Sequence, residues 1–206
     1  IYGNVKGKVS ENNKPNPKSY YAFTKYESEK LIKKYAKINN FKFIILRYFN
    51  VAGASKSGNI GEIGNKNNRL IKNFATQYLK KNPKIKIYGS NYPTKDGTCV
   101  RDYIHVSDLA DIHYKCFRYL KKYSTSNIFN CGYEKGYSVL EIAKIFKKMK
   151  KNLQIIYKKR RIGDVGQVFS STSKFKKLIG WRPKYNNINK ILMSSIKWEK
   201  KIRKYR

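Results

Sequence analysis

The sequence has 206 residues, with 47 lysines and arginines against 12 acidic residues, so its formal net charge is +35 at pH 7. Apolar residues make up 40% of the chain, which is enough to bury a core in one or two domains and argues against general disorder. No apolar run approaches the roughly 18 residues that a membrane span needs, so we expect no membrane partner.

The basic residues are spread over every segment of the chain rather than gathered in one patch. No known nucleic-acid-binding motif accompanies them. We interpret them as solvated lysine faces and expect no specific nucleic-acid partner, with weak binding to polyanions at low salt. A dedicated nucleic-acid surface is the alternative, because clustered lysines release counterions from a phosphate backbone.

The cysteines and histidines give no pattern of a metal site or a disulfide framework. Cys99, Cys116 and Cys131 lie far apart without CxxC spacing, which indicates reduced thiols in a cytoplasmic protein. His105 and His113 have no ligand spacing to a third group. We therefore expect structural histidines and no metal.

The predicted elements alternate between helices and strands. In the first half we expect helices at 20–39 and 70–79, a buried strand at 41–49 and a short strand at 84–88. We expect loops at 50–67 and 90–101. In the second half we expect an extended run at 102–106 and strands at 126–131 and 153–157. We expect helices at 107–119, 139–149, 173–179 and 188–204. This order indicates an α/β protein.

Local signals mark several helix ends. Ser107 is the expected N-cap of the helix at 107–119, and Ser138 forms a capping box with Glu141. Gly180 closes the helix before it.

The first helix has apolar residues at helical spacing. They are Tyr26, Leu31, Tyr35 and Ile38, and we expect them to form its apolar face.

Tyr21 and Lys25 form a YxxxK motif near the start of the first helix. A spacing of four places the phenol and the ammonium on one helical face. A nearby cation stabilises the phenolate, which makes the phenol a candidate general base for an alcohol or sugar hydroxyl. The motif is short, and a core tyrosine beside a solvated lysine is the alternative.

The strands are too few for a complete doubly wound sheet, and we find no glycine-rich phosphate-binding loop. The chain also begins with Ile1 rather than Met. We therefore expect that it is the C-terminal portion of a longer protein.

Several long motifs follow one another along the chain. They are NPKSYYAFTK at 16–25, RYFNVAGA at 47–54, GE at 61–62, YGSNYPTKDGTCVRDYIHV at 88–106, DLA at 108–110, RRIGD at 160–164 and GWRP at 180–183. Together they resemble the extended short-chain dehydrogenase/reductases and, within them, the UDP-glucose 4-epimerases. The resemblance covers nearly the whole chain.

The resemblance implies a partial Rossmann-type (doubly wound) sheet without its N-terminal strands, plus a smaller C-terminal α/β substrate-binding domain. Residues 1–55 would be the C-terminal part of the NAD-binding Rossmann domain. Residues 56–206 would mainly bind the UDP-sugar, with a segment near 102–131 returning to the Rossmann domain. The family's NAD fingerprint and its catalytic Ser/Thr would precede Ile1, so we expect these 206 residues alone to be inactive.

The resemblance also implies the chemistry and the cofactor, NAD. Tyr21 would take the proton from the sugar C4 hydroxyl, and Lys25 would stabilise its phenolate and bind the nicotinamide ribose. Tyr48 and Phe49 would flank the nicotinamide, and Asn50 would lie by the sugar or its diphosphate. UDP-glucose and UDP-galactose would interconvert through a 4-keto sugar without net redox change.

The UDP moiety would be held by the second half of the chain. The resemblance assigns Arg101 and Arg161 to the diphosphate and Asp164 to the ribose hydroxyls, because guanidinium suits phosphate oxygens and carboxylate accepts from hydroxyls. From the residues alone, surface ion pairs are the alternative for the arginines.

The uracil would be wrapped by Leu70, Lys86 and Tyr88, with Tyr88 as its stacking partner. Core packing is the alternative for Tyr88.

Three positions depart from the family pattern. Arg69, in the substrate-binding set, stands where a smaller polar ligand of the diphosphate is usual, and Lys72 stands where a proline is. Val168 replaces a bulky tyrosine that gates the sugar pocket, so we expect the intact enzyme also to accept UDP-N-acetylglucosamine.

Two other interpretations of the function stay open. The intact protein could be another nucleotide-sugar enzyme of the same family, either a 4,6-dehydratase or a uronate epimerase. The fragment by itself could instead be a non-catalytic, basic remnant. The family resemblance implies a homodimer for the intact protein, formed through helices beside the sheet that include the YxxxK helix.

Overall fold

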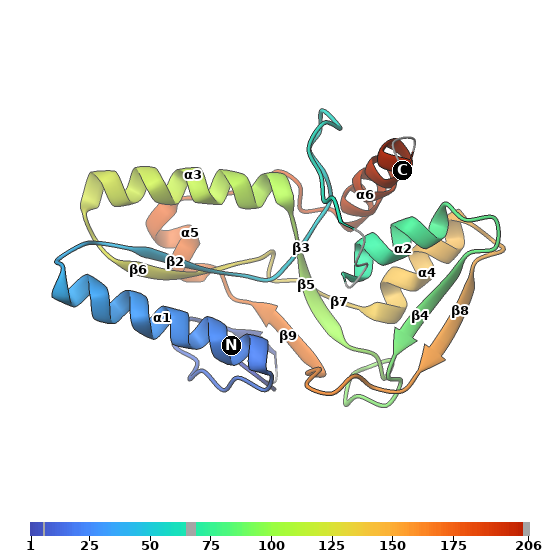
Figure 1. Ribbon diagram of the computed structural model, residues 1–206, viewed down its shortest axis with the longest axis horizontal. Coiled ribbons are helices and arrows are strands. Elements are labelled where there is room, and N and C mark those ends of the chain that lie inside the picture. Colours follow the sequence, from blue (N-terminus) through green and yellow to red (C-terminus); the bar gives the residue numbers. More distant parts are fainter. Residues whose placement is uncertain (6, 65–68, 204–206) are drawn as a thin grey trace.

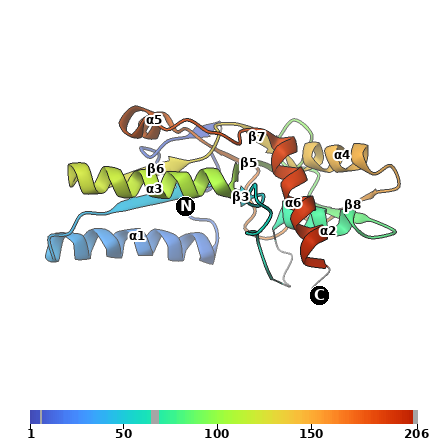
Figure 2. The same cartoon turned by 90° about the horizontal axis from the view of Figure 1, so that it is seen from above.

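Two groups of elements lie side by side in the computed structural model, which describes residues 1–5, 7–64 and 69–203 (Figure 1). One group holds α1, β2, β6, α3 and α5, and the other holds α2, α4, α6, β4 and β8, with β5 running between them (Figure 2). The helices are α1 (Tyr20–Ile38), α2 (Leu70–Tyr78), α3 (Val106–Tyr123), α4 (Val139–Met149), α5 (Ser173–Ile179) and α6 (Ile188–Ile202). The strands are β1 (Lys8–Val9), β2 (Ile44–Tyr48), β3 (Asn50–Ala52), β4 (Lys84–Tyr88), β5 (Val100–His105), β6 (Asn127–Cys131), β7 (Gly136–Ser138), β8 (Gln154–Lys158) and β9 (Gln167–Ser170).

All three sheets contain parallel pairs, as the α/β prediction requires. β2 pairs with β6 and β4 pairs with β8, each in a two-stranded parallel sheet. The third sheet has the order β1-β9-β5-β3, with β7 antiparallel to β5. The helix α3 follows β5 and leads into β6, the parallel partner of β2.

A buried ion pair holds α1 against β2. Glu29 on α1 accepts two hydrogen bonds from the Arg47 guanidinium of β2, at 2.8 and 2.7 Å. Both side chains are under a tenth exposed, at 8% for Arg47 and 5% for Glu29. Arg47 also donates to the Tyr2 hydroxyl at 2.9 Å, and that hydroxyl donates to Asn130 on β6 at 2.6 Å. The network therefore fixes the orientation of the YxxxK helix.

The predicted apolar face of α1 does not point into the core. Leu31, Tyr35 and Ile38 are exposed, whereas the buried residues of α1 are Glu29 and Ala36. Helical spacing shows that a face exists but not which element covers it. In the described residues α1 packs on β2 through its charged network, which leaves these side chains uncovered.

A cluster of aromatic and aliphatic side chains between α2, α4, β4 and β8 forms much of the core. Phe74 meets Phe146 edge to face at 5.8 Å, and Ile85 and Ile87 of β4 are fully buried. The predicted capping box is confirmed, since Ser138 accepts from the Glu141 N–H and Glu141 accepts from the Ser138 N–H. The hydrophobic side of α4 is thereby set against this core.

Several predicted boundaries are wrong. The loop predicted at 50–67 begins with β3, and the loop predicted at 90–101 ends in the first residues of β5. The N-cap of α3 is His105, whose Nδ1 accepts from the Ser107 N–H at 3.1 Å, so Ser107 is not the cap. The ends of the predicted ranges 50–67 and 188–204 lie outside the described residues.

Asp102 ties the third sheet to the turn after β6. Its buried carboxylate accepts from the Ser170 hydroxyl at 2.6 Å and from the Tyr133 N–H at 2.9 Å. Burial raises the pKa of Asp102, and these donors act in the opposite direction. A Cβ on Gly132 would lie 2.4 Å from this carboxylate, so the close approach requires glycine.

In the described part of the chain, no helix combines the length and the apolar character needed to cross a bilayer.

Candidate functional site

The YxxxK pair lies on the first turns of α1, where the Ser19 hydroxyl caps the helix by accepting from the Ala22 N–H at 3.2 Å. The Lys25 Nζ is 5.3 Å from the centre of the Tyr21 ring. Tyr21 is 71% exposed, so it is not a core tyrosine. The phenol is available to a ligand, with a cation on the same helical face.

Tyr21 opens onto a cavity of about 860 Å³. The cavity is lined from distant parts of the chain, since α1, the β2–β3 segment, α2, β4, β5 and the loop after β8 all contribute. It brings together most of the predicted site residues: Tyr21, Tyr48, Phe49, Asn50, Arg69, Leu70, Lys86, Tyr88, Arg101, Arg161 and Asp164. A volume of this size matches that of small-molecule sites.

Lys25 and Val168 do not line the cavity. Lys25 is exposed one helical turn after Tyr21 and reaches the cavity only through the tyrosine ring. Val168 is half-buried on β9, in register with Arg101 on β5. Paired residues of neighbouring strands share a face of the sheet, so Val168 lies on the same face as Arg101.

Two consecutive aromatic side chains, Tyr48 and Phe49, line the cavity together with Tyr21. Tyr48 is half-exposed at the end of β2, with its ring 6.5 Å from the His113 ring of α3. Phe49 follows it, and its N–H donates to the Cys131 carbonyl of β6 at 3.1 Å. This backbone bond fixes where the two aromatic residues enter the cavity.

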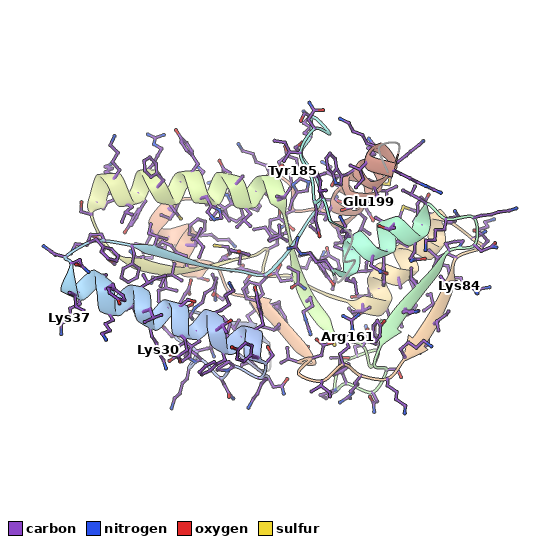
Figure 3. The ribbon with its side chains drawn as sticks, in the orientation of Figure 1. Lys30, Lys37, Lys84, Arg161, Tyr185 and Glu199 are labelled. Carbon is purple, nitrogen blue, oxygen red and sulfur yellow. The ribbon has the colours of Figure 1, made fainter. Side chains whose placement is uncertain are left out.

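Two arginines and their partners also line the cavity. The Arg161 guanidinium carbon lies 3.9 Å from the centre of the Tyr88 ring, and Figure 3 shows Arg161 on the loop beside β4 and β8. The Arg101 Nη2 is 3.9 Å from the Asp164 Oδ1, and its Nη1 donates to the Val100 carbonyl at 2.9 Å. One face of Tyr88 is thus covered by a guanidinium, which the stacking prediction for this ring did not anticipate.

Other residues line the cavity without having been predicted for it, among them Glu62, Tyr103, Lys72, Trp198 and Glu199. Burial raises the pKa of Tyr103, which favours its neutral phenol. Lys72 carried a signal in the sequence as a departure from the family pattern, and Glu62 and Tyr103 stand inside two of the motifs. Trp198 and Glu199 stand in a segment whose local pattern predicts only a helix.

The two histidines have structural contacts. The His105 ring stacks on Tyr185 at 4.4 Å and 15°, and burial lowers its pKa. His113 Nδ1 lies 2.8 Å from the Leu109 carbonyl oxygen, one helical turn earlier. Within residues 1–5, 7–64 and 69–203, no three His, Cys, Asp or Glu side chains gather closely enough to hold a metal. All three cysteines are buried and unpaired.

Gly58, Gly61 and Gly64 have the spacing of a dinucleotide fingerprint, but the geometry is not that of a phosphate-binding turn. Gly61 packs against the Trp198 ring, where an added Cβ would lie 2.4 Å away. The next helix, α2, does not start directly after them. A fingerprint needs a strand and a helix N-terminus on either side of its glycines.

The model of the NAD dependent epimerase/dehydratase family matches residues 1–132. The chain belongs to this family. The family prediction made from the motifs is therefore confirmed. Membership is consistent with the parallel pairing of β2 and β6 and with the exposed YxxxK helix beside them.

Similar family members are named as UDP-glucose 4-epimerases. The chain is 38% identical to the enzyme of Lactobacillus helveticus over 93% of its own length. It superposes with a TM-score of 0.92 and 30% identity on the enzyme from Stenotrophomonas maltophila with bound NAD and formylated UDP-arabinopyranose, covering 100% of this chain and 62% of that one. It matches the UDP-Glc/GlcNAc 4-epimerase of Campylobacter jejuni with a TM-score of 0.74 and 39% identity, covering 97% of this chain and 61% of that one.

The chain spans 58% of the length of the Lactobacillus helveticus enzyme. The match to the solved structures confirms the α/β fold class.

Proposed function

We propose that the full-length product of this gene is an NAD-dependent UDP-hexose 4-epimerase that interconverts UDP-glucose and UDP-galactose. The observation that carries the proposal is the position of the Tyr21 phenol at a cavity that Arg101, Arg161 and Asp164 also line. A proton acceptor and a cluster suited to a nucleoside diphosphate then share one cavity. The names of the similar family members support this function.

The residues beside Tyr21 fit the nicotinamide and ribose end of NAD. The Lys25 ammonium and the Tyr21 phenol can bind ribose hydroxyls, and the half-exposed rings of Tyr48 and Phe49 can flank a nicotinamide. Bound NAD would supply the hydride acceptor for the substrate carbon. We also propose that residues 1–55 and a segment near 102–131 belong to the NAD domain and most of 56–206 to the UDP-sugar domain, which the β2–β6 pairing supports.

The proton chemistry belongs to Tyr21. The phenolate accepts the proton of the sugar C4 hydroxyl when that carbon is oxidised, and the phenol returns a proton to the same oxygen when the carbon is reduced. Lys25 stabilises the phenolate from the same helical face. Tyr21 is returned to its starting protonation state after each turnover, so the same residue serves the forward and the reverse epimerisation.

The remaining cavity residues orient the UDP. Arg101 and Arg161 would donate to diphosphate oxygens, and Asp164 would accept from ribose hydroxyls. Leu70, Lys86 and Tyr88 would surround the uracil. The uncovered face of the Tyr88 ring suits a base, since Arg161 already occupies the other. Asn50 and Arg69 would lie near the sugar and the diphosphate.

The experiment is an assay of the purified full-length product. We expect NAD to be released on denaturation and UDP-glucose to yield UDP-galactose, followed by NMR of the sugar protons. A 4-keto-6-deoxy product, or turnover of UDP-glucuronate alone, would instead support the dehydratase or the uronate epimerase. Absence of both bound NAD and turnover would contradict the proposal and favour the non-catalytic, basic remnant.

We extend the proposal to UDP-N-acetylglucosamine. Two observations favour it: the small Val168 on the face of Arg101, and the similarity to the UDP-Glc/GlcNAc 4-epimerase of Campylobacter jejuni. A small side chain leaves space for a substituent at the sugar C2. Turnover of UDP-glucose without turnover of the N-acetylated sugar would refute this extension.

We also propose a homodimer in the cytoplasm. The apolar side chains left exposed on α1 and α3 support the dimer: Leu31, Tyr35, Ile38, Tyr114, Phe117 and Tyr123. Both helices flank the β2–β6 pair (Figure 1), so they can cover one another across two copies. Light scattering of the wild type and of Phe117→Arg tests this, with a monomeric wild type as the contrary result. The unpaired cysteines support the location, which cell fractionation tests.

A further inference from the structure

Lys72 is a buried cation on the first turn of α2. Its side chain is 4% exposed, and its Nζ lies 3.3 Å from the Glu199 Oε1 of α6, which is equally buried. The other carboxylate oxygen of Glu199 accepts from the Thr76 hydroxyl at 3.0 Å. A buried ammonium is tolerated only when its charge is paired and its protons are bonded. Glu199, labelled in Figure 3, supplies the charge.

The second partner of Lys72 is a backbone group of another segment. Its Nζ donates to the Glu62 carbonyl at 2.7 Å, and the Trp198 indole N–H donates to the same carbonyl at 2.9 Å. One peptide group is therefore held from α2 and from α6 together. The Trp198 ring also packs on Gly61, directly before that peptide group.

This anchored segment is coupled to the cavity. The Glu62 carboxylate is 3.2 Å from the Arg69 guanidinium, at the residue that precedes α2. Arg69 has no side-chain hydrogen bond to cap α2. Glu62, Arg69 and Leu70 all line the cavity. Fixing the Glu62 carbonyl thus sets the relative position of three groups that face the ligand.

We propose that Lys72 is a positioning residue, which holds the Glu62 peptide against α2 and α6 so that Arg69 and Leu70 face the nucleotide. This inference rests on the proposed function, because it takes UDP as the ligand of the cavity. It assigns Lys72 a role in substrate affinity rather than in the proton transfer at Tyr21.

The test removes the buried charges together, so that neither is left unpaired. In the full-length product we compare Lys72→Met/Glu199→Gln with Trp198→Phe, which removes only one donor to the Glu62 carbonyl. The matched control is Lys150→Met. Lys150 donates to the Tyr78 and Lys80 carbonyls at 2.8 and 2.7 Å, at the other end of α2 and away from the cavity.

Two measurements are made on each folded variant: the Kd of UDP by calorimetry, and amide hydrogen exchange in residues 61–64. We expect the double variant to raise the Kd about tenfold or more and Trp198→Phe to raise it by a smaller factor, because displaced binding groups lose alignment. Both should exchange faster at 61–64. The control should lower the melting temperature while the Kd and the exchange at 61–64 stay unchanged.

A Kd equal to that of the wild type in both variants would overturn the inference, and so would a control that weakens UDP binding as much as they do. If the double variant does not fold, the Kd of UDP and the exchange at 61–64 in Trp198→Phe decide whether the inference holds. A wild type that binds UDP but does not interconvert the sugars contradicts the proposed function and leaves this comparison valid. If the wild type binds no UDP, slow exchange at 61–64 that only the two variants lose would still support the anchoring by Lys72.

Discussion

The guanidinium carbon of Arg161 lies 3.9 Å from the centre of the Tyr88 ring, and that of the preceding Arg160 lies 4.0 Å from the centre of the Tyr92 ring. Cation–π contacts contribute about 0.5–2 kcal/mol, depending on how far they are desolvated. The two adjacent arginines therefore contact two different tyrosine rings. Arg161 and Tyr88 line the cavity, whereas Arg160 lies outside it and covers the buried Tyr92.

Replacing each arginine should therefore separate binding from stability. We expect Arg161→Ala to weaken UDP binding about tenfold or more, because charge-assisted hydrogen bonds contribute about 1.5–3 kcal/mol. Arg160→Ala should lower the melting temperature and leave the Kd of UDP near that of the wild type. Calorimetry and thermal unfolding measure the two effects. Equal loss of affinity in both variants would contradict the assignment of Arg161.

Tyr21→Phe should remove the proton transfer without removing the site. We expect kcat to fall by about 10²–10⁴-fold, the usual contribution of a general acid–base group. Bound NAD and the Kd of UDP should change little. Tyr20→Phe is the matched control, since Tyr20 is 83% exposed and does not line the cavity. A Tyr21→Phe enzyme of unchanged kcat would exclude the phenol from the chemistry.

Breaking the Arg47–Glu29 pair should destabilise the protein. We expect Arg47→Met to lower the free energy of unfolding by about 3–5 kcal/mol, because it leaves a buried carboxylate unpaired. Arg47→Met/Glu29→Gln should lose less than the sum of the single changes. Lys30→Ala breaks the exposed pair with Glu27 and should change the free energy of unfolding little, because water screens that pair. Urea unfolding of these three variants and of Glu29→Gln measures the losses, and equal losses at Arg47 and Lys30 would refute the role of burial.

The sequence pattern located elements that carry a clear local signal and missed strands of two to four residues. The strand at 84–88 and the helix at 139–149 were predicted at their observed limits, since alternation and a capping box are local signals. β1, β7 and β9 were missed, because strands this short carry little periodicity and are defined by their partners. The cap of α3 was misplaced for a related reason: a histidine ring nitrogen replaced the expected hydroxyl.

The site could be proposed only from the long motifs. Tyr48, Tyr88 and Arg161 stand in unrelated local patterns, and no spacing rule brings them to one cavity. The buried Lys72–Glu199 pair was also beyond local reasoning, since the two residues stand on different helices far apart in the sequence. The partner that makes a buried charge acceptable is a tertiary property.

Glu134 should make the protein acid-sensitive. Burial alone would raise the pKa of its carboxyl, but hydrogen bonds from Thr172 and from Lys176 lower the pKa to about 2. The folded pKa lies below the ordinary value of 4.5, so the stabilisation is complete above that pH and is lost as the pH falls toward 2.

We expect Glu134→Gln to have a lower free energy of unfolding than the wild type. This difference should be largest above pH 5 and should shrink as the pH falls toward 2. Urea unfolding at a series of pH values measures this difference. A difference that does not vary with pH would contradict the assigned pKa.

Val168→Tyr tests the proposed sugar range. Placing a bulky ring on the face of Arg101 should reduce turnover of UDP-N-acetylglucosamine by about tenfold or more, while UDP-glucose turnover stays within about twofold. Val168→Leu adds less volume and serves as the control. Parallel kcat/KM measurements on both sugars decide, and an equal loss for both would show a general disturbance rather than a gate.

The contact between Gly61 and Trp198 restricts how this gene can evolve. Any side chain at position 61 would collide with the indole, with a Cβ at 2.4 Å from the ring, so position 198 must change first. Changing it first removes a donor from the Glu62 carbonyl. Position 198 therefore has to mutate before position 61, and the first mutant has one hydrogen bond fewer to the Glu62 carbonyl. We expect descendants of this gene that carry a side chain at position 61 to have a smaller residue than tryptophan at position 198.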